Sequence, residues 1–535
     1  MSGSAACTCD TGYTGATCSA CATNYIQFPS GTGTCIADPC IGVTCSGHGT
    51  CSNTTGVAVC NCSAGFAESD CSRCVRYASP TGGTGNAQTW ANAGGNLNSV
   101  VAAARSAITG SGGSITTCEV WAKSGTYFLY PNRIGLQTNV ELYGGFVGSE
   151  TQRAQRDFAV NPTVLDPRQS DGGVLITNGI VNGNALNTVL DGFTLRNGYA
   201  YVGGGDDKGG AFSTNGGTHR VANCRFEDNM SNGSGGAVYA EAFNTTSTVV
   251  IDKCVFLRNQ AGGAGGAISF GTFGGLTISL SNLQFFGNTA NASGGAISGA
   301  TTNVVVNKFE NLLFVGNRAA VGGAIDLGGT GAVSMTNITA FGNGATNGVG
   351  GLSLNQTPTT VSNSIFQGNG TTRSLSSGAT ATFSYSDIAQ ADGGVGVFDS
   401  DPQFVARPNA YDWAIDGGTT GSFVVNDGAQ YSAGQTLELG FDGVARTVTS
   451  VAGTVVNFSP SRTTAARLTV ANWGAGAVSV TASYELQAGS MCVDAANGAL
   501  APVFDLLGRG RVDQSRVDTG VGTPSYADLG AFERQ

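Results

Sequence analysis

The sequence predicts an all-β chain built on a right-handed parallel β-helix, with a disulfide-rich segment before it and a small β insert near the C-terminus. Three observations predict this fold class. Twelve of the sixteen cysteines lie before residue 75, and a Gly-Gly turn recurs with a period of 26 to 30 residues farther along the chain. Glycine accounts for 84 of 535 residues and charged residues for only 11%. We therefore expect helix formation to be disfavoured throughout.

The cysteine-rich segment covers residues 1–76. So short a segment cannot bury enough apolar surface to fold on a core alone, and disulfides replace the core in an oxidising compartment. C-x-x-C pairs can also bind zinc. Here, however, neither a second C-x-x-C nor a histidine pair stands at the spacing that zinc ligands require. We therefore expect disulfides, no metal and no cofactor. Two similar runs carry this pattern, Cys7-x-Cys9 to Cys18-xx-Cys21 and Cys60-x-Cys62 to Cys71-xx-Cys74.

These runs resemble EGF-like modules of the laminin subtype. The resemblance implies that the first module is incomplete, so we expect an export signal and further sequence upstream of Met1. It also implies a disulfide from Cys74 forward to Cys118, which would tie the segment to the next domain. The implied pairs are Cys9 with Cys18, Cys21 with Cys35, Cys40 with Cys51, Cys45 with Cys60, Cys62 with Cys71, and Cys74 with Cys118.

A fixed period identifies a repeat architecture in the central part of the chain. Gly-Gly-Ala turns recur at Ala211, Ala237, Ala267, Ala296 and Ala324. A second marker has the same period, because an Asn closes a short apolar run at 229, 259, 288, 317, 343 and 369. Leucine-rich repeats and propeller blades have other spacings. The repeat therefore predicts coils of a parallel β-helix.

Each coil contains a predicted corner six residues before the closing Asn. The apolar residues change parity there, for example at Asn223, and Asn tolerates the left-handed conformation that a bend requires. Stacked coils place equivalent residues in columns, so we expect a buried aromatic stack in which Phe341 substitutes for the gap at Ala340. Cys224 and Cys254 share one inward column, either as part of an apolar column or as a disulfide. The expected stack consists of Phe226, Phe256, Phe285, Phe314 and Phe366.

The segments on both sides of the repeat carry motifs of their own. They include Trp90-Ala91-Asn92-Ala93, Leu142-Tyr143-Gly144-Gly145-Phe146, Asp401-Pro402-Gln403-Phe404 and Asp528-Leu529-Gly530-Ala531-Phe532-Glu533. In this order they resemble the bacterial choice-of-anchor Q family of surface β-helix proteins, and the coils also resemble the repeats of chlamydial polymorphic outer-membrane proteins. The family resemblance implies export and surface display. We expect Trp90 and Trp121 to close one end of the β-helix and the strand 528–533 to close the other.

These patterns divide the chain into six parts. The region between Trp413 and Tyr484 alternates like strands and predicts a small β-sandwich or barrel-like insert. Such an insert provides either a binding surface or a purely structural flap. The expected parts are a partial EGF-like module at 1–38, an EGF-like module at 39–76, an N-terminal cap at 77–130, a β-helix at 131–413, an insert at 414–482, and a C-terminal end and cap at 483–535.

Composition excludes several classes of partner. The net charge is −10 without a basic stripe, which argues against nucleic acid. No run of about eighteen apolar residues occurs, so we expect no transmembrane segment. Polysaccharide lyases and glycoside hydrolases share the predicted fold, and their chemistry requires convergent carboxylates. The weak candidates are Asp206 and Asp207 beside Lys208, with His219, Arg220, Glu227 and Asp228 one coil on.

The sequence therefore predicts a secreted or cell-surface structural and adhesive protein that contacts extracellular proteins or glycans. One alternative is a subunit of a self-assembling fibre or coat. The other is a polysaccharide-cleaving enzyme that uses Asp206 and Asp207.

Overall fold

The structure is a computed structural model. It describes residues 8–31, 34–129, 133–167, 181–182, 186–201, 207–242, 246–271, 275–370, 375–377, 381–390, 393–414, 419–462, 469–477, 479–514 and 518–535. The chain forms two compact units. Unit 1 comprises Met1–Gly125 and Asn139–Thr163, and unit 2 comprises Thr126–Thr138 and Val164–Gln535. The chain crosses from one unit to the other within β10 (Gly125–Phe128) and β13 (Thr163–Asp166).

Unit 1 begins with the disulfide-rich segment. Its six disulfides are the pairs that the laminin-type pattern implied, including the bond from Cys74 to Cys118 over 44 residues. Cys7 lies outside the described residues. Short antiparallel pairs connect the cysteines: β1 (Tyr13–Thr14) with β2 (Ala20–Cys21), β3 (Tyr25–Gln27) with β4 (Cys35–Ala37), and β5 (Gly49–Ser52) with β6 (Val59–Cys62), with the short helix η1 (Cys45–Gly47) before β5.

The rest of unit 1 is a parallel layer covered by a helix. After β7 (Phe66–Ala67), strand β8 (Arg73–Gly83) pairs with β9 (Cys118–Lys123), which pairs with β12 (Val140–Phe146). The expectation that helices are disfavoured throughout was wrong for α1 (Leu97–Gly110), because Asn96 caps its first turn and its apolar residues recur at helical spacing. Trp121 is buried and stacks on Phe146 at 4.8 Å between ring centroids. Short helices are η2 (Trp90–Asn92) and η3 (Arg153–Gln155).

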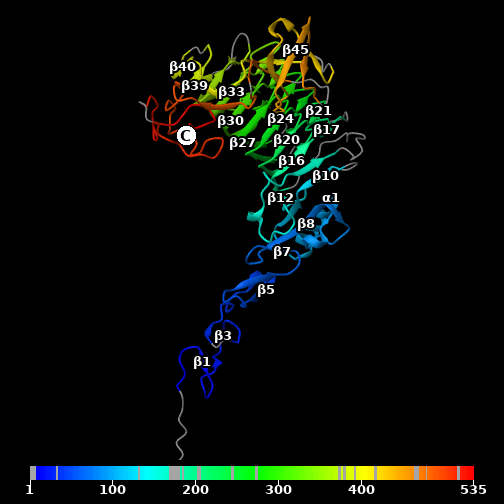
Figure 1. Ribbon diagram of the computed structural model, residues 1–535, viewed down its shortest axis with the longest axis vertical. Helices are drawn as coiled ribbons and strands as arrows, with labels where there is room; N and C mark the ends of the chain where they lie inside the picture. The colour runs from blue at the N-terminus through cyan, green and yellow to red at the C-terminus, as the bar shows by residue number, and fades with distance from the viewer. Residues whose placement is uncertain are drawn as a thin grey trace, which may run out of the picture. The chain divides into compact units, whose positions relative to one another are not determined.

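Unit 2 contains the parallel β-helix, and Figure 1 shows its strands lying side by side coil after coil. Three parallel sheets run along it. The first contains β15 (Thr188–Asp191), β16 (Phe193–Arg196), β19 (Gly217–Ala222), β20 (Arg225–Glu227), β23 (Thr246–Asp252), β24 (Val255–Leu257), β27 (Gly275–Phe286), β30 (Val304–Val315), β33 (Val333–Phe341), β36 (Thr359–Ser362), β37 (Ile365–Gln367), β39 (Ala381–Ile388) and β40 (Val395–Phe398).

The other two sheets are made of shorter strands. The second contains β11 (Ile134–Gly135), β14 (Val181–Asn182), β18 (Phe212–Thr214), β22 (Val238–Ala240), β26 (Ile268–Phe270), β29 (Ile297–Ala300), β32 (Ile325–Gly328), β35 (Leu352–Asn355) and β38 (Leu375–Ser377). The third contains β17 (Tyr199–Ala200), β21 (Met230–Ser231), β25 (Gln260–Ala261), β28 (Thr289–Ala290), β31 (Arg318–Ala319) and β34 (Gly344–Ala345).

The predicted phenylalanine stack fills the interior of the coils. Phe226, Phe256, Phe285 and Phe314 are fully buried, and successive rings lie 4.7–4.9 Å apart. Ala340 is the gap in register between Phe314 and Phe366. The expectation that Phe341 fills this gap was wrong, because neighbouring residues of a strand point to opposite faces. The Phe341 ring instead packs on Phe404 and Tyr484.

Two columns of asparagine have different roles. The predicted corners adopt the left-handed conformation, with φ from 51° to 56°. The closing asparagines are buried, and each side-chain amide donates to the side-chain oxygen of the next at 2.8–2.9 Å. We call this second column the asparagine ladder, and it consists of Asn229, Asn259, Asn288, Asn317, Asn343 and Asn369.

Cys224 and Cys254 are buried free thiols, so the alternative of a disulfide between them was wrong. Each thiol lies in the apolar column and donates to a carbonyl of its own coil. Cys224 Sγ is 3.1 Å from the Ala222 oxygen, and Cys254 Sγ is 3.3 Å from the Asp252 oxygen.

The insert is a single six-stranded antiparallel sheet rather than a sandwich or barrel. Its sheet begins at residue 410, four residues before the expected boundary, and it has its own core around Phe423 and Leu437. The strand pair β41 (Phe404–Ala406) and β48 (Ser483–Leu486) flanks it. Its strands are β42 (Ala410–Trp413), β43 (Ser422–Val424), β44 (Gln435–Leu439), β45 (Arg446–Ala452), β46 (Val455–Ser459) and β47 (Thr469–Ala475), with the short helix η4 (Gly428–Gln430).

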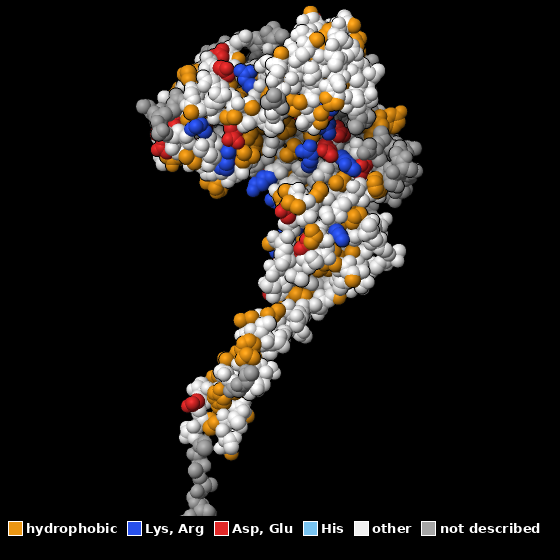
Figure 2. Space-filling view, viewed as in Figure 1, with side chains coloured by type: hydrophobic (Ala, Val, Ile, Leu, Met, Phe, Trp, Pro, Cys, Tyr) orange, Lys and Arg blue, Asp and Glu red, His pale blue; other side chains and the backbone are white. Residues whose placement is uncertain are grey.

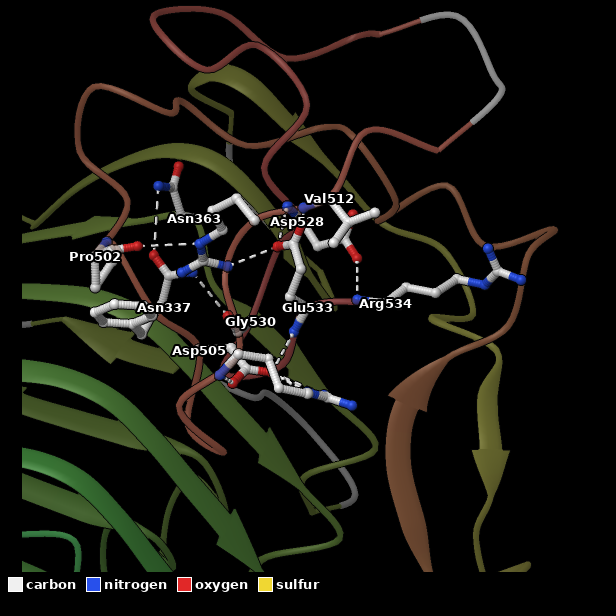
Figure 3. A network of polar contacts seen from close by, with 12 residues as sticks. Asn337, Asn363, Pro502, Asp505, Val512, Asp528, Gly530, Glu533 and Arg534 are labelled. Carbon is white, nitrogen blue, oxygen red and sulfur yellow. Dashed lines mark hydrogen bonds and ion pairs between the residues drawn. The ribbon is translucent and has the colours of Figure 1, made fainter.

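The segment after β48 lies along the side of the coils. The expectation of a terminal strand at 528–533 was wrong, since these residues form bends and irregular chain. The corner side chains explain this position, because their amides donate to the segment. Asn311 donates to the Phe504 carbonyl, and Asn363 donates to that of Asn497. Asn337 donates to the Gly530 carbonyl (Figure 3). Among the described residues, no helix is both long enough and apolar enough to cross a membrane.

We predict that Asn288→Ala lowers the free energy of unfolding by at least about 3 kcal/mol, since it leaves several buried polar groups without partners. Asn288 accepts from the backbone and side chain of Asn259 and donates to Asn317 and to the Phe256 carbonyl. Guanidinium denaturation measures this change. The exposed Asn347 is the control, and its replacement by Ala should change stability by less than about 0.5 kcal/mol. Equal effects at the two positions would contradict a structural role for the ladder.

Candidate functional site

A row of glycines on the coils receives the insert. Gly287, Gly316 and Gly342 each precede a ladder asparagine and have φ of 59°, 62° and 66°. Earlier coils hold Asp228 and Arg258 at the same position with φ of 54° and 56°. The backbone conformation alone therefore does not require glycine here. We call Gly287, Gly316 and Gly342 the glycine track.

Aromatic side chains of the insert lie directly on the glycine track. A Cβ atom on Gly287 or Gly316 would come within 2.9 Å of the Phe441 ring, and one on Gly342 would overlap the Tyr411 ring. Phe441 itself has φ of 56°, which is strained for a bulky residue and persists only where its surroundings hold it. One such contact is a hydrogen bond from Arg258 to the Gly440 carbonyl at 2.8 Å. The absence of side chains on the track thus permits close docking.

Trp413 closes one end of a groove between the insert and the coils. Its ring covers Gly344, and its indole N–H donates to the Gly316 carbonyl at 3.1 Å. The Arg318 guanidinium lies 5.4 Å from the centre of its ring, within range of a cation–π interaction. The groove has a volume of about 210 Å³. Its lining consists of Gln260, Thr289, Ala290, Asn291, Arg318, Ala319, Ala320, Thr346, Trp413 and Ala414.

The third sheet forms the floor of the groove. Strands β25, β28 and β31 are two residues long, so one residue of each faces outward and the other is a buried Ala of the core. Gln260, Thr289 and Arg318 are direct neighbours in register across three coils. Adjacent strands lie about 4.8 Å apart, so these side chains form a regular polar row. Such a row, bounded by an aromatic ring, can bind an extended polar ligand.

A second hollow of about 580 Å³ lies beside the chain that leads into the insert, around Pro402 and Arg407. It contains two carboxylates, and both accept hydrogen bonds. Asp399 accepts from Gln367 at 3.1 Å, and Asp401 is paired with Arg407 at 3.3 Å. These carboxylates therefore help hold the chain around Pro402.

The structure describes all but one of the charged residues that the sequence singled out. Asp206 lies outside the described residues. Asp207 is half-buried, and its carbonyl accepts from the Gly233 N–H. His219 was wrongly grouped with Asp207, because its ring is buried between the hydroxyls of Thr188 and Thr214 at 2.7 and 3.0 Å.

The remaining charged candidates lie on the coil surface, and each has a polar partner. Arg220 pairs with Asp191 at 3.3 Å, Glu227 with Arg225 at 2.8 Å, and Asp228 with Arg258 at 2.7 Å. Lys208 donates to the Tyr239 hydroxyl at 3.1 Å. Figure 2 shows the same intermixing, with positive and negative side chains adjacent to one another over the coils.

We did not predict from the sequence that the residues of the groove would form a binding site. A signal for its floor was present, since Gln260, Thr289 and Arg318 each follow a ladder asparagine directly. The aromatic end could not be found in this way. Trp413 reaches the floor only because the insert folds back onto the glycine track, which no local pattern specifies.

Titratable side chains of the insert have raised pKa values. Burial, together with the nearby Asp442, raises the pKa of Glu438 in β44 to about 7. Burial also raises the pKa of Tyr411 well above its ordinary value, and its hydroxyl is hydrogen-bonded to that of Tyr484. Glu438 thus titrates near neutral pH inside the insert.

Two comparisons with known proteins gave matches. A family model described as the Chlamydia polymorphic membrane protein repeat matches residues 223–241 and 282–300. Each match runs from a corner asparagine through the Gly-Gly-Ala turn, which confirms the resemblance of the coils to these repeats. A solved tailspike protein of the E. coli bacteriophage HK620, in complex with a pentasaccharide, is 12% identical, with 71% of this chain and 89% of that chain covered and a TM-score of 0.19. No curated protein matches the chain.

We predict that Gly316→Ala loosens the insert from the coils, because the new methyl group meets Phe441. The matched control is Gly453→Ala, since Gly453 has φ of 61° and open space where a Cβ would lie. Both variants carry the same backbone strain of about 1 kcal/mol. Hydrogen exchange of residues 435–441 should therefore accelerate at least tenfold in the first variant only. Equal acceleration in both would mean that strain, rather than docking, is being measured.

We further predict that stability falls as pH rises from about 4.5 to 7, because the raised pKa means that the folded state binds more protons there. Glu438→Gln keeps an oxygen for the Gly443 N–H and removes the titration. Relative to the wild type, this variant should gain up to about 3 kcal/mol between pH 5 and pH 8. Chemical denaturation across this range provides the measurement. An unchanged difference between the two proteins would refute the assignment to Glu438.

Proposed function

We propose that this protein is an adhesive module of a bacterial cell surface or of the extracellular space, and that it binds glycans in the groove closed by Trp413. The observation that carries the proposal is the row of Gln260, Thr289 and Arg318 across three coils, ending at that indole ring. Amide, hydroxyl and guanidinium groups hydrogen-bond sugar hydroxyls, and an aromatic face packs on the apolar face of a sugar ring.

Two observations support a place for this protein outside the cytoplasm. Six disulfides require an oxidising compartment, so they favour export. The repeat family matched by the coils is named for a membrane protein of Chlamydia, which supports a place at the cell surface. The choice-of-anchor Q and EGF-like resemblances agree with this proposal, with the disulfide-rich segment acting as a stalk.

The charge of the groove narrows the ligand class. Arg318 is the one cationic residue among its described lining residues, and Trp413 is its aromatic partner. A guanidinium favours a carboxylate or sulfate group over a neutral sugar. We therefore expect acidic polysaccharides, such as those that contain uronic acids, to bind best.

Binding without cleavage is part of the proposal. Glycoside hydrolysis requires two carboxylates at the scissile bond. None of the described residues that line the groove is Asp or Glu. The cleavage alternative would have to use another surface, such as the second hollow with Asp399 and Asp401.

We predict that the protein binds acidic oligosaccharides on a glycan array and that Arg318→Gln weakens binding to the best ligand at least tenfold, which is about 1.4 kcal/mol. Arg225→Gln is the control, because Arg225 lies on the first sheet and pairs with Glu227. Calorimetry gives both affinities. Equal losses in the two variants, or no binding to any sugar, would remove the groove from consideration. Shortening of the same polysaccharide by the wild type would instead favour an enzyme.

A further inference from the structure

Three carboxylates meet in the irregular segment that follows β48. Ligand oxygens of Asp494, Asp513 and Asp518 all lie within 4.8 Å of one another. Asp494 is completely buried, whereas the other two are exposed. Carboxylates repel one another at this separation unless a positive charge lies between them. The arrangement therefore needs a reason.

Asp494 supplies the second observation. Its side chain is fully buried, yet neither of its oxygens has a hydrogen-bond partner among the described residues. A buried carboxylate without a partner costs several kcal/mol. Arg511, whose side chain is buried in the same segment, is already paired, because it donates to Glu533 at 2.7 Å. A bound cation would compensate the Asp494 charge.

The backbone around Asp494 holds the three residues in position. Its carbonyl accepts from the N–H groups of Thr519 and Gly520 at 3.0 and 2.9 Å, which fixes the neighbouring Asp518. Its own N–H donates to Asp528 at 2.7 Å.

The third ligand is fixed from the other side. The N–H of Val512, next to Asp513, donates to Glu533 at 3.0 Å, within the network drawn in Figure 3. Each carboxylate is thus attached to backbone that is already hydrogen-bonded. A site held in this way requires little reorganisation when a ligand binds.

The electrostatics of the surroundings agree with this geometry. The pKa of Asp494 is raised to about 6, mainly by burial; the charges of Asp518, Asp513 and Glu533 contribute in the same direction, and the nearby backbone N–H of Gln514 lowers it. Burial and Glu533 likewise raise the pKa of Asp528 to about 7. Several carboxylates therefore surround Asp494, and their charges give this part of the segment a negative potential.

We propose that Asp494, Asp513 and Asp518 bind one calcium ion. Carboxylate oxygens are ligands of hard cations, and Ca²⁺ has bonds of about 2.3–2.6 Å, so oxygens on its opposite sides lie about 4.6–5.2 Å apart. Mg²⁺ has shorter bonds and would draw the oxygens closer together. Ligand oxygens that lie within 4.8 Å of one another fall inside the span of a calcium coordination shell. Extracellular calcium sites have dissociation constants on the order of 10⁻⁴–10⁻³ M.

A calcium ion at this position would connect two stretches of the segment that follows β48. Asp513 and Asp518 lie on the chain between Arg511 and Gly520, and Asp494 lies near the start of the same segment. A shared ion would hold these two stretches together. The segment in turn accepts hydrogen bonds from Asn337 and Asn363 of the coils. Calcium would therefore stabilise the attachment of the C-terminal segment to the β-helix.

Calorimetric titration of chelator-treated full-length protein with CaCl₂ tests the proposal. We expect one ion per chain with a dissociation constant on the order of 10⁻⁴–10⁻³ M and at least tenfold weaker binding of MgCl₂. Replacing both exposed ligands, Asp513→Asn with Asp518→Asn, should abolish calcium binding. The control is Asp427→Asn, because Asp427 is an exposed helix cap that Asn also provides. Absent binding, or binding retained in the double variant, would overturn the proposal.

A second variant tests the buried charge itself. Asp494→Asn removes the charge, so in EGTA it should unfold at a higher temperature than the wild type. In 5 mM calcium the wild type should gain stability while this variant does not respond. Lower stability of Asp494→Asn in EGTA would mean that its carboxylate is already compensated, and the calcium site would then be rejected.

Discussion

The hydrogen bonding of one coil to the next is the constraint on which the rest of unit 2 depends. Each ladder asparagine bonds both the backbone and the side chain of its neighbour, so every coil fixes the height and register of the following one. Buried amides are costly unless all their partners are present. This requirement keeps the period between 26 and 30 residues, although the loops between the strands differ in sequence. The phenylalanine stack then fills the interior that the ladder defines.

Regular stacking has consequences on the outside of the coils. One position beyond the ladder becomes a row of outward side chains, and one position before it becomes a row in the left-handed conformation. Where the second row changes from Asp228 and Arg258 to glycine, the insert docks through Phe441 and Tyr411. Docking places Trp413 over the first row and creates the groove. The proposed binding site thus depends on two columns of the repeat, the glycine track before the ladder asparagines and the outward side chains that follow them.

The corner asparagines have a second use that follows from their conformation. A left-handed corner directs its side chain away from the strand, where its amide needs an acceptor. Carbonyls of the C-terminal segment supply these acceptors at Asn337 and Asn363. The described part of this segment contains no strand, so side chains and buried carboxylates maintain its shape. Charged residues are scarce in the chain as a whole but cluster near its end, where Asp494, Asp528 and Glu533 are all buried.

The sequence by itself determined the fold class, the period, the corners and the phenylalanine stack, because each depends on residues repeated at a fixed interval. The half-cystine pairs were implied by the resemblance to laminin-type modules. Only the tertiary structure decided the other features. The Phe341 ring packs outside the coil, His219 is buried between two threonine hydroxyls, and the C-terminal segment lies along the coils instead of forming a terminal strand. The groove and the three converging aspartates also belong to this second group. Their residues are up to 154 positions apart in the sequence. No local pattern encodes such contacts, because they depend on how the insert and the C-terminal segment pack against the coils.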